Sequence, residues 1–240
     1  MKKYFYILFV LSWFMTSRLF AQADLLISGG NTVSSYICGN SVVTVWGKND
    51  GGRLGLPASA GAGTVVTEPM MIPLESFDGK TVQQVNSGSG GHFVALTCGT
   101  ASEKPQVWSW GGNDRGQIGN GVKGGIVSAP IRVLASSVID AAYKETVGGK
   151  TYLVGAKIVY AGGASSYAIL DNGDLVSWGG NASGANQYTH AYGILGNGTQ
   201  TDSYEAVYVL TGAGARLKNV VAVCAGDNAA YALDASGQVW

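Results

Sequence analysis

The chain has 240 residues, of which only 12% are charged, and its 15 basic and 15 acidic side chains balance. Nucleic-acid binding depends on a basic surface that displaces counterions from phosphates, so this composition argues against nucleic acid as a partner. Glycine occurs 37 times, which favours tight turns and closely packed strands over helices.

The first 23 residues have the pattern of a secretory signal peptide. Lys2 and Lys3 give a positive start, residues 5–14 are apolar apart from Ser12, and Ala21-Gln22-Ala23 fits a cleavage site. A membrane anchor would need about 20 uninterrupted apolar residues, and polar residues break this stretch. We therefore expect residues 1–23 to be removed on export.

Removal of this segment would leave a mature chain of residues 24–240. It has 12 basic and 15 acidic side chains, a net charge of −3, because the removed segment holds three basic residues and no acidic one. We expect no membrane insertion of the mature chain and a location outside the cell or at its surface, with the periplasm as an alternative. The short basic start and the glycine-rich body are typical of a bacterial exported protein.

A motif of Trp-Gly, a polar turn and Gly-(Ile/Leu)-Gly occurs three times. The copies begin at Trp46, Trp110 and Trp178, which lie 64 and 68 positions apart. Self-similarity at a long period indicates one supersecondary unit that is copied and that needs its neighbours to bury its apolar face. An aromatic residue precedes each copy and also opens a partial fourth one: Tyr36, Phe93, Tyr167 and Tyr231.

Each copy is expected to form about four short strands, and no stretch has a helical period with caps. In the third copy, Asn172-Gly173 predicts a type I′ hairpin turn between strands at 167–170 and 175–178. Four strands per repeat is the content of a propeller blade. A second strand pair is predicted after each Gly-(Ile/Leu)-Gly: 71–74 with 82–85, 130–134 with 138–142, and 206–210 with 220–224.

These motifs resemble the regulator of chromosome condensation repeat, with Trp-Gly-x-Asn-x-x-Gly-x-(Leu/Ile)-Gly preceded by Gly-x4-(Tyr/Phe)-x-(Ala/Ile)-Leu over residues 28–240. The kelch repeat fits less well because it lacks the Gly-(Ile/Leu)-Gly element. The resemblance implies an all-β fold of four-stranded antiparallel blades, most often seven in that family. We expect an incomplete propeller of three to four blades over 24–240, a fragment, with repeats at about 28–86, 87–160, 161–224 and 225–240.

The recurring Trp is expected to fill the core between blades rather than to stack on a ligand, since an aromatic residue that recurs once per unit usually packs in a core. His92 is expected to have a structural hydrogen-bonding role. The third repeat carries an insertion at 182–192, which is either a partner-contact loop or inert, and both interpretations stay open. The candidate contact residues in and beside it are Asn181, Gln187, Tyr188, His190 and Tyr192.

No motif predicts catalysis, a cofactor or a metal site. The Gly-Lys-Thr runs at 79–81 and 149–151 lack the glycine that a phosphate-binding loop has five positions earlier. Residues 171–174 read Asp-Asn-Gly-Asp, which a hairpin turn explains without calcium. We therefore expect a non-enzyme.

Three cysteines in an exported chain leave at least one without an intramolecular partner. Cys38 and Cys98 each follow a repeat aromatic, so a disulfide between adjacent blades and unpaired thiols are both open. Their spacings, with Cys224, do not resemble a zinc site.

The expected function is that of an exported, non-catalytic propeller that serves as a scaffold for a protein or glycan partner at the bacterial cell surface. Rigid blades suit this role because they hold loops in fixed positions and so limit the entropy lost on binding. Two alternatives are a secreted protein inhibitor of an enzyme and an accessory propeller of a larger exported enzyme. The sequence itself does not name the partner.

Overall fold

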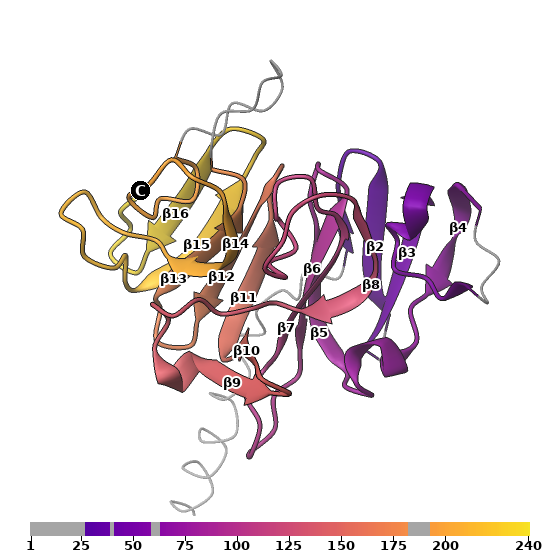
Figure 1. Cartoon of the computed structure of the whole chain (residues 1–240), viewed down its shortest axis with the longest axis horizontal. Helices are drawn as coiled ribbons and strands as arrows, with labels where there is room; N and C mark the ends of the chain where they lie inside the picture. Colours follow the sequence, from indigo (N-terminus) through magenta and orange to yellow (C-terminus); the bar gives the residue numbers. More distant parts are fainter. Residues whose placement is uncertain (1–26, 39–40, 59–62, 182–192) are drawn as a thin grey trace, which may run out of the picture.

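The structure is a computed structural model that describes residues 27–38, 41–58, 63–181 and 193–240. It confirms the all-β fold. The described residues form five antiparallel sheets; four of them cross the molecule in sequence order (Figure 1), and the fifth is a two-stranded hairpin described below. The first sheet has strands β1 (Ile27–Gly29), β2 (Val33–Cys38), β3 (Val42–Lys48) and β4 (Val65–Met71); the second has β5 (Val82–Ser87), β6 (His92–Thr97), β7 (Val107–Gly112) and β8 (Ile126–Arg132); the third has β11 (Ala156–Ala161), β12 (Ser165–Leu170), β13 (Leu175–Gly179) and β14 (Ser203–Tyr208); and the fourth has β15 (Val220–Ala225) and β16 (Ala230–Asp234).

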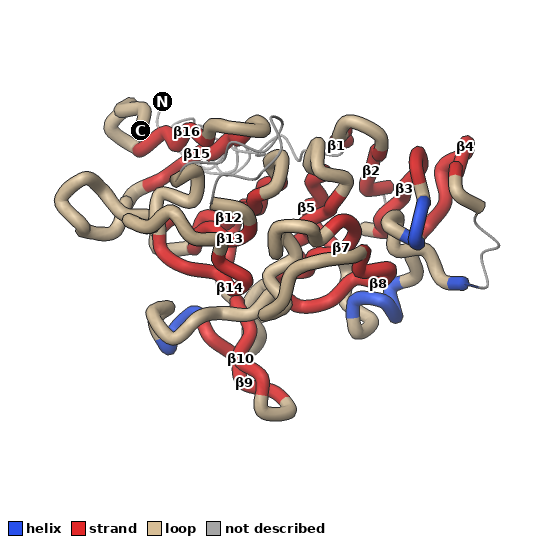
Figure 2. The backbone as a smooth tube through the Cα atoms, turned by 45° about the horizontal axis from the view of Figure 1, so that its top comes forward, coloured by secondary structure: helices blue, strands red, loops and turns tan. Residues whose placement is uncertain are grey.

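The sheets are stacked through their first strands, as in the blades of a propeller. Strand β5 contacts β1 and β2 of the first sheet, β11 contacts β5 and β6, and β15 contacts β11 and β12. Figure 2 shows β1, β5 and β15 on one side of the molecule and β8 and β14 towards the other. The described chain is therefore a partial propeller.

Each pair of neighbouring sheets encloses its own apolar core. Strand β6 illustrates the reason, because all six of its residues are buried. Its side chains alternate between two faces: Phe93 and Ala95 belong to the core shared with the first sheet, whereas Val94 and Leu96 belong to the core shared with the third. A third core joins the third and fourth sheets. Strands buried on both faces need apolar residues at successive positions, which explains the short continuous apolar runs in the sequence.

The sheets are offset from the sequence repeats by one strand. We call the glycine that lies five residues before each repeat aromatic, such as Gly88 before Phe93 and Gly162 before Tyr167, the repeat glycine. Strand β5 precedes Gly88 and β11 precedes Gly162, so the first strand of each of these sheets lies before the repeat glycine. The stretch that begins at residue 87 therefore supplies β6, β7 and β8 to the second sheet and β11 to the third.

The strand expected at 138–142 is wrong. That segment leads into a 3-10 turn, η4 (Ala141–Tyr143), in which the Tyr143 amide donates to Asp140 O (2.9 Å). A hairpin follows, formed by β9 (Lys144–Val147) and β10 (Lys150–Leu153), with its turn at two glycines of positive φ. The strand expected at 71–74 is also largely wrong, because β4 ends at Met71 and a second 3-10 turn, η3 (Leu74–Phe77), follows. The third described 3-10 turn, η1 (Asp50–Gly52), lies between β3 and β4.

The hairpin at Asn172-Gly173 is confirmed, but its predicted type I′ turn is wrong. Gly173 has a φ of +86°, whereas Asn172 is not among the residues with positive φ. The loop is one residue longer than a type I′ turn, with the Leu170 amide donating to Asp174 O (2.9 Å). The Asn172 side chain accepts the Asp174 amide (2.9 Å), so it stabilises the turn through its oxygen.

Candidate functional site

The repeat glycines lie where successive sheets come closest together. A Cβ atom at Gly30 would overlap Gly88 O, and a Cβ at Gly88 would overlap Gly162 O. Neither glycine has a positive φ, so the requirement comes from the close approach of the backbones. At Gly162 the approach is looser, because its Cβ would lie 2.9 Å from the Ala225 Cβ and 3.3 Å from Gly226 O.

Side-chain amides join the first strands of the second and third sheets. Gln84 on β5 donates to Val159 O (3.1 Å) and accepts the Val159 amide (2.9 Å), so it pairs with β11 as a backbone peptide would. Asn86 accepts the amide of Ala161 (2.8 Å). Between the first and second sheets, the Ser87 amide donates to the Ser28 hydroxyl (3.0 Å). These bonds satisfy strand edges that would otherwise be buried without partners.

We call the three Gly-x-(Leu/Ile)-Gly segments, Gly52–Gly55, Gly116–Gly119 and Gly193–Gly196, the glycine tails. The first two each receive a tryptophan from the next sheet. Trp110 on β7 is fully buried against the first tail, and its indole N–H donates to Leu54 O (3.1 Å). A Cβ at Gly55 would lie 2.7 Å from the Trp110 ring. Glycine is therefore required for the indole to enter the tail.

The second tail also receives an indole, which donates to the carbonyl one position earlier in the tail. Trp178 on β13 is fully buried, donates to Gln117 O (2.9 Å), and would lie 2.8 Å from a Cβ at Gly119. Wedge packing of the repeated Trp between sheets is thus confirmed at both positions. Phe93 stacks on the Trp110 ring with centroids 5.0 Å apart, which adds an aromatic pair to the first of the two contacts.

His92 has the structural role that the sequence predicts. It is fully buried on β6, and its Nε2 atom lies 3.0 Å from the Ser166 hydroxyl of the third sheet. The Ser166 hydroxyl donates its only proton to Gln117 O (2.8 Å), so Nε2 must be the donor to Ser166. Burial lowers the pKa of His92 to about 4, which keeps the ring neutral.

The asparagine after each Trp-Gly holds the start of its loop. Asn49, Asn113 and Asn181 are all buried, and their side-chain oxygens accept the amides of the tail residues Leu54 (3.1 Å), Ile118 (3.1 Å) and Leu195 (2.9 Å). From the sequence, Asn49 and Asn113 were placed only in a polar turn, and Asn181 was named as a candidate contact residue. The recurrence of this asparagine at the same distance from Trp was the signal that could have revealed the role.

The candidate contact residues are not brought together by the described part of the structure. Gln187, Tyr188, His190 and Tyr192 lie in 182–192, outside the described residues. Asn181 is described and fully buried, and its amide nitrogen donates to Thr199 O (2.9 Å) and to Asn197 Oδ1 (3.1 Å). Its side chain is therefore engaged within the fold.

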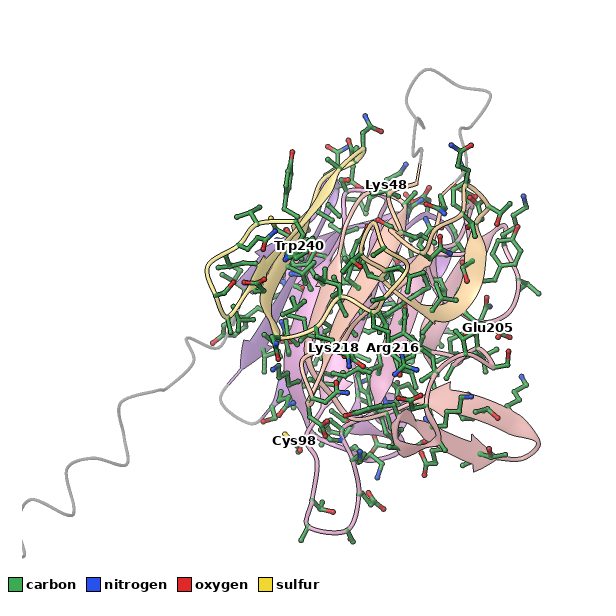
Figure 3. All side chains as sticks on the ribbon, turned by 90° about the vertical axis from the view of Figure 1, so that its left-hand side faces the viewer. Lys48, Cys98, Glu205, Arg216, Lys218 and Trp240 are labelled. Atoms are coloured by element: carbon green, nitrogen blue, oxygen red, sulfur yellow. The ribbon has the colours of Figure 1, made fainter. Side chains whose placement is uncertain are left out.

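The third glycine tail borders a pocket of about 290 Å³ between the third and fourth sheets. The walls are mainly apolar and come from both sheets. Trp240 lies over the fourth sheet, on the side of the molecule that also carries Arg216 and Lys218 (Figure 3). The main lining residues are Leu195, Val209, Leu217, Val223, Ala232 and Trp240. An apolar pocket with a few backbone polar groups is the usual form of a binding site.

An ion pair joins the segment before η4 to the loop that follows β14. Arg216 donates to both carboxylate oxygens of Asp140 (2.6 and 2.8 Å), which lowers the pKa of Asp140, and its guanidinium lies 3.8 Å from the centroid of the Tyr208 ring. Burial, together with a hydrogen bond to Asp171, raises the pKa of Tyr143 to about 12. These groups are engaged with one another, so they organise loops rather than present reactive side chains.

Cys98 and Cys224 are free thiols, and the side chain of Cys38 lies outside the described part. Among the residues that the structure describes, no three His, Cys, Asp or Glu side chains gather where they could hold a metal ion. In the same part of the chain, no helix has the length and apolar character needed to span a bilayer.

Comparison with known proteins finds relatives with the same repeats, although no protein-family model matches the chain. The ultraviolet-B receptor UVR8 of Arabidopsis thaliana is 26% identical over 199 residues, which cover 82% of this chain and 37% of the receptor. The RCC1 domain-containing protein RUG3 of the same plant, a mitochondrial protein, is 33% identical over 137 residues, which cover 56% of this chain and 24% of RUG3. The chain thus spans at most 37% of the length of these two relatives.

Among solved structures, yeast RCC1 (Prp20) bound to Kap60 aligns with 89% of this chain and 54% of its own, with a TM-score of 0.43 and 19% identity. The stacked antiparallel sheets and the Trp that enters a glycine tail define a β-propeller repeat protein. With the similarity to UVR8 and RUG3, these repeats are of the regulator of chromosome condensation (RCC1) type. An RCC1-like propeller is in general a scaffold for protein interaction.

Proposed function

We propose that the protein is an exported, non-catalytic propeller that presents its loops to a protein or glycan partner at the bacterial cell surface. The first 23 residues support export, because a basic start, an apolar stretch and Ala21-Gln22-Ala23 occur in the order of a signal peptide. The net charge of −3 on residues 24–240 argues against nucleic acid as the partner.

The observation that carries the scaffold role is the way in which successive sheets are joined. Backbones meet at Gly30, Gly88 and Gly162, amides of Gln84 and Asn86 bridge two first strands, and buried Trp side chains enter the tails. The loops between strands therefore start from fixed positions, so this chain loses little conformational entropy when they are ordered by a partner. His92, the histidine that the structure describes, is buried and neutral and serves this framework.

Export is tested by expressing the full chain with a C-terminal tag in a bacterial host and determining its N-terminus by mass spectrometry. The proposal predicts a mature N-terminus at Asp24 and accessibility to protease added outside intact cells, or outside the inner membrane of spheroplasts. The variant Ala23→Phe should block cleavage, whereas Ala23→Ser, a small residue, should not. A chain that keeps Met1 and stays in the cytoplasm would contradict export.

The contact loop is tested by capture of surface proteins and glycans with the mature chain. Deletion of 182–192 should remove the captured partner, whereas Val147→Ser, on the exposed β9–β10 hairpin, should leave capture unchanged. Both variants must show the wild-type far-ultraviolet circular dichroism spectrum. Equal capture by the deletion variant would discard this loop as the contact surface.

A further inference from the structure

The β9–β10 hairpin extends the third sheet beyond its outer strand, β14. The Ser136 amide donates to Ala206 O (3.1 Å) on β14, and the Ala206 amide donates to Leu134 O (2.9 Å). On the other side of this segment, the Ala135 amide donates to Thr151 O (3.0 Å) on β10. Figure 2 shows the hairpin projecting from the body of the molecule. Main-chain hydrogen bonds therefore hold a projecting element in a fixed position near β14.

The turn of the hairpin contains the Gly-Lys-Thr run at 149–151. Gly148 and Gly149 have φ angles of +57° and +78°, and Val147 pairs with Lys150, so the two glycines form a two-residue hairpin turn. The run places Lys150 at the start of β10, where it lines an open pocket of about 710 Å³. The hairpin, residues 134–141 and β14 bound this pocket, and its volume is within the range of small-molecule sites.

Two lysines give the pocket a positive charge. Lys144 and Lys150 both line it, whereas Glu205 on β14 is the one carboxylate among the described lining residues. The Lys144 ammonium donates to Ser137 O (2.9 Å), which leaves it further N–H donors. Lys150 is exposed, and its side chain makes no ion pair or hydrogen bond with the described residues. Both ammonium groups therefore have donors for a ligand.

The neighbouring acids do not cancel this charge. Within the described part of the chain, neither Lys144 nor Lys150 forms an ion pair with Glu205. Glu145, the acid of the hairpin itself, is paired with Arg132. The pocket thus carries two ammonium groups and one carboxylate, on residues 24–240 whose net charge is −3. A local excess of positive charge in a pocket attracts an anionic ligand.

Hydroxyl groups and an apolar wall complete the pocket. The Thr146 and Thr151 hydroxyls lie 3.2 Å apart and share one hydrogen bond, so the pair keeps one O–H donor and unused lone pairs. Glu205 supplies a strong acceptor, and Leu134 and Ala135 supply apolar surface. A sugar ring that carries a carboxylate matches this set, because its hydroxyls both donate and accept and its C–H face is apolar. An acidic peptide offers carboxylates but no row of hydroxyls.

We propose that this pocket binds a uronic acid residue of an acidic glycan. The sugar carboxylate lies at Lys144 and Lys150, where charge-assisted hydrogen bonds hold it, and the ring hydroxyls face Glu205 and the pair formed by Thr146 and Thr151. This inference names a ligand class for the scaffold role proposed above and rests on that role for its biological use. Binding of the sugar itself depends on the pocket alone.

The probe is tetragalacturonate, an oligosaccharide of α-1,4-linked galacturonate residues. Titration of the purified chain with this probe, followed by two-dimensional NMR, should give saturable one-to-one binding, with amide shifts centred on Lys144, Lys150, Thr151 and Glu205. The carboxyl-reduced tetrasaccharide, which keeps the rings and hydroxyls but has no charge, should bind at least tenfold more weakly. A tetrapeptide of glutamate, which has the charge but no ring hydroxyls, should also bind at least tenfold more weakly.

Substitution of the two lysines tests their role in the pocket. Lys144→Gln combined with Lys150→Gln should weaken binding of tetragalacturonate at least tenfold, because it removes both partners of the carboxylate. Main-chain hydrogen bonds hold the hairpin, so this variant should keep the wild-type circular dichroism spectrum. Lys218→Gln is the matched control, since this lysine is also exposed but does not line the pocket. Its binding should equal that of the wild type.

Three results would overturn the proposal: no saturable binding to the wild-type chain, equal binding of the carboxyl-reduced sugar or of the glutamate peptide, or shifts that map away from the hairpin and Glu205. The comparison of probes holds even where the lysine variant fails to fold, because it uses the unaltered chain. Failure here would leave the proposed function standing, since export and capture through 182–192 do not involve this pocket. Conversely, a cytoplasmic chain that binds tetragalacturonate would remove the cell-surface role and keep the pocket.

Discussion

The junction between the second and third sheets and the junction between the third and fourth sheets use the same repeat but differ in the contacts that their described residues make. At the former, Trp178 is buried in the second glycine tail. The backbones also come so close that a Cβ atom at Gly88 would overlap Gly162 O. At the latter, the third glycine tail borders a pocket. A Cβ atom added at Gly162 would lie 2.9 Å from its nearest neighbour, the Ala225 Cβ. The glycine tail is therefore best understood as a receptor for an indole from the next sheet rather than as a self-contained turn.

The largest expected effect comes from removing the indole that closes the former junction. Trp178→Ala should lower the free energy of unfolding by about 3 to 5 kcal/mol, because it empties a buried site and leaves a cavity. Trp240→Ala, at the other junction, should cost less than about 1 kcal/mol, because this side chain is 44% exposed. Urea unfolding followed by circular dichroism measures both. Equal losses would show that the two junctions do not differ.

The glycines sharpen the same comparison. Gly88→Ala should cost about 3 kcal/mol, because its Cβ would overlap the Gly162 carbonyl and lie 2.6 Å from the His92 ring, and a backbone atom cannot rotate away. Gly162→Ala should cost clearly less, since its nearest neighbour is the Ala225 methyl group. Gly226→Ala, where a Cβ meets nothing within 4 Å and φ is not positive, is the control and should be neutral or slightly stabilising. A neutral Gly88→Ala would contradict the close approach of the backbones.

Acid should weaken the closed junction through His92. The pKa of this side chain is about 4 in the folded chain and about 6.5 when it is unfolded, so the unfolded chain takes up the proton first as pH falls. The stability due to neutral His92 is therefore complete above pH 6.5 and is lost as the pH falls towards 4, by up to about 3 kcal/mol in all.

The control for this effect is His92→Gln, which keeps a neutral N–H donor for the Ser166 hydroxyl. Its free energy of unfolding should change much less with pH between 6.5 and 4.5. That window lies above the range in which carboxylates such as Asp234, whose pKa is lowered to about 2 by hydrogen bonds from Ser236 and Trp240, become protonated. A wild-type slope equal to that of His92→Gln would show that the imidazole is not the titrating group.

Much of the fold could be predicted from the sequence because its signals are local and repeated. The Trp-Gly spacing, the apolar strand runs and the recurring glycines each mark one copy of the repeated sheet. Together they predict stacked antiparallel sheets. The structural role of His92 was predicted from its place beside Phe93, where the resembled repeat family often has a histidine. The 3-10 turn at Ala141–Tyr143 and the β9–β10 hairpin broke the pattern, because the second repeat is lengthened there by residues that have no counterpart in the other repeats.

The contacts between units were harder to predict, since they depend on which sheet each loop faces. Nothing local shows that Trp178 enters the tail of the second sheet rather than its own, or that Gln84 pairs with Val159, 75 residues away. In the sequence, Asn181 cannot be told from an exposed loop asparagine. Only the structure shows that it is buried and that its side-chain oxygen accepts the Leu195 amide of the third glycine tail. Residues 182–192 lie outside the described residues, so both interpretations of the insertion, a partner-contact loop and an inert loop, stay predictions.

Hydrogen exchange of the indole N–H groups tests the central claim most directly, because each Trp that closes a junction donates to a carbonyl of the preceding sheet. With ¹⁵N-labelled tryptophan, the indole protons of Trp110 and Trp178 should exchange orders of magnitude more slowly than that of Trp240, and only through large-scale opening of the sheets. Exchange of Trp178 as fast as that of Trp240 would mean that the indole does not seal the junction, and would contradict the account.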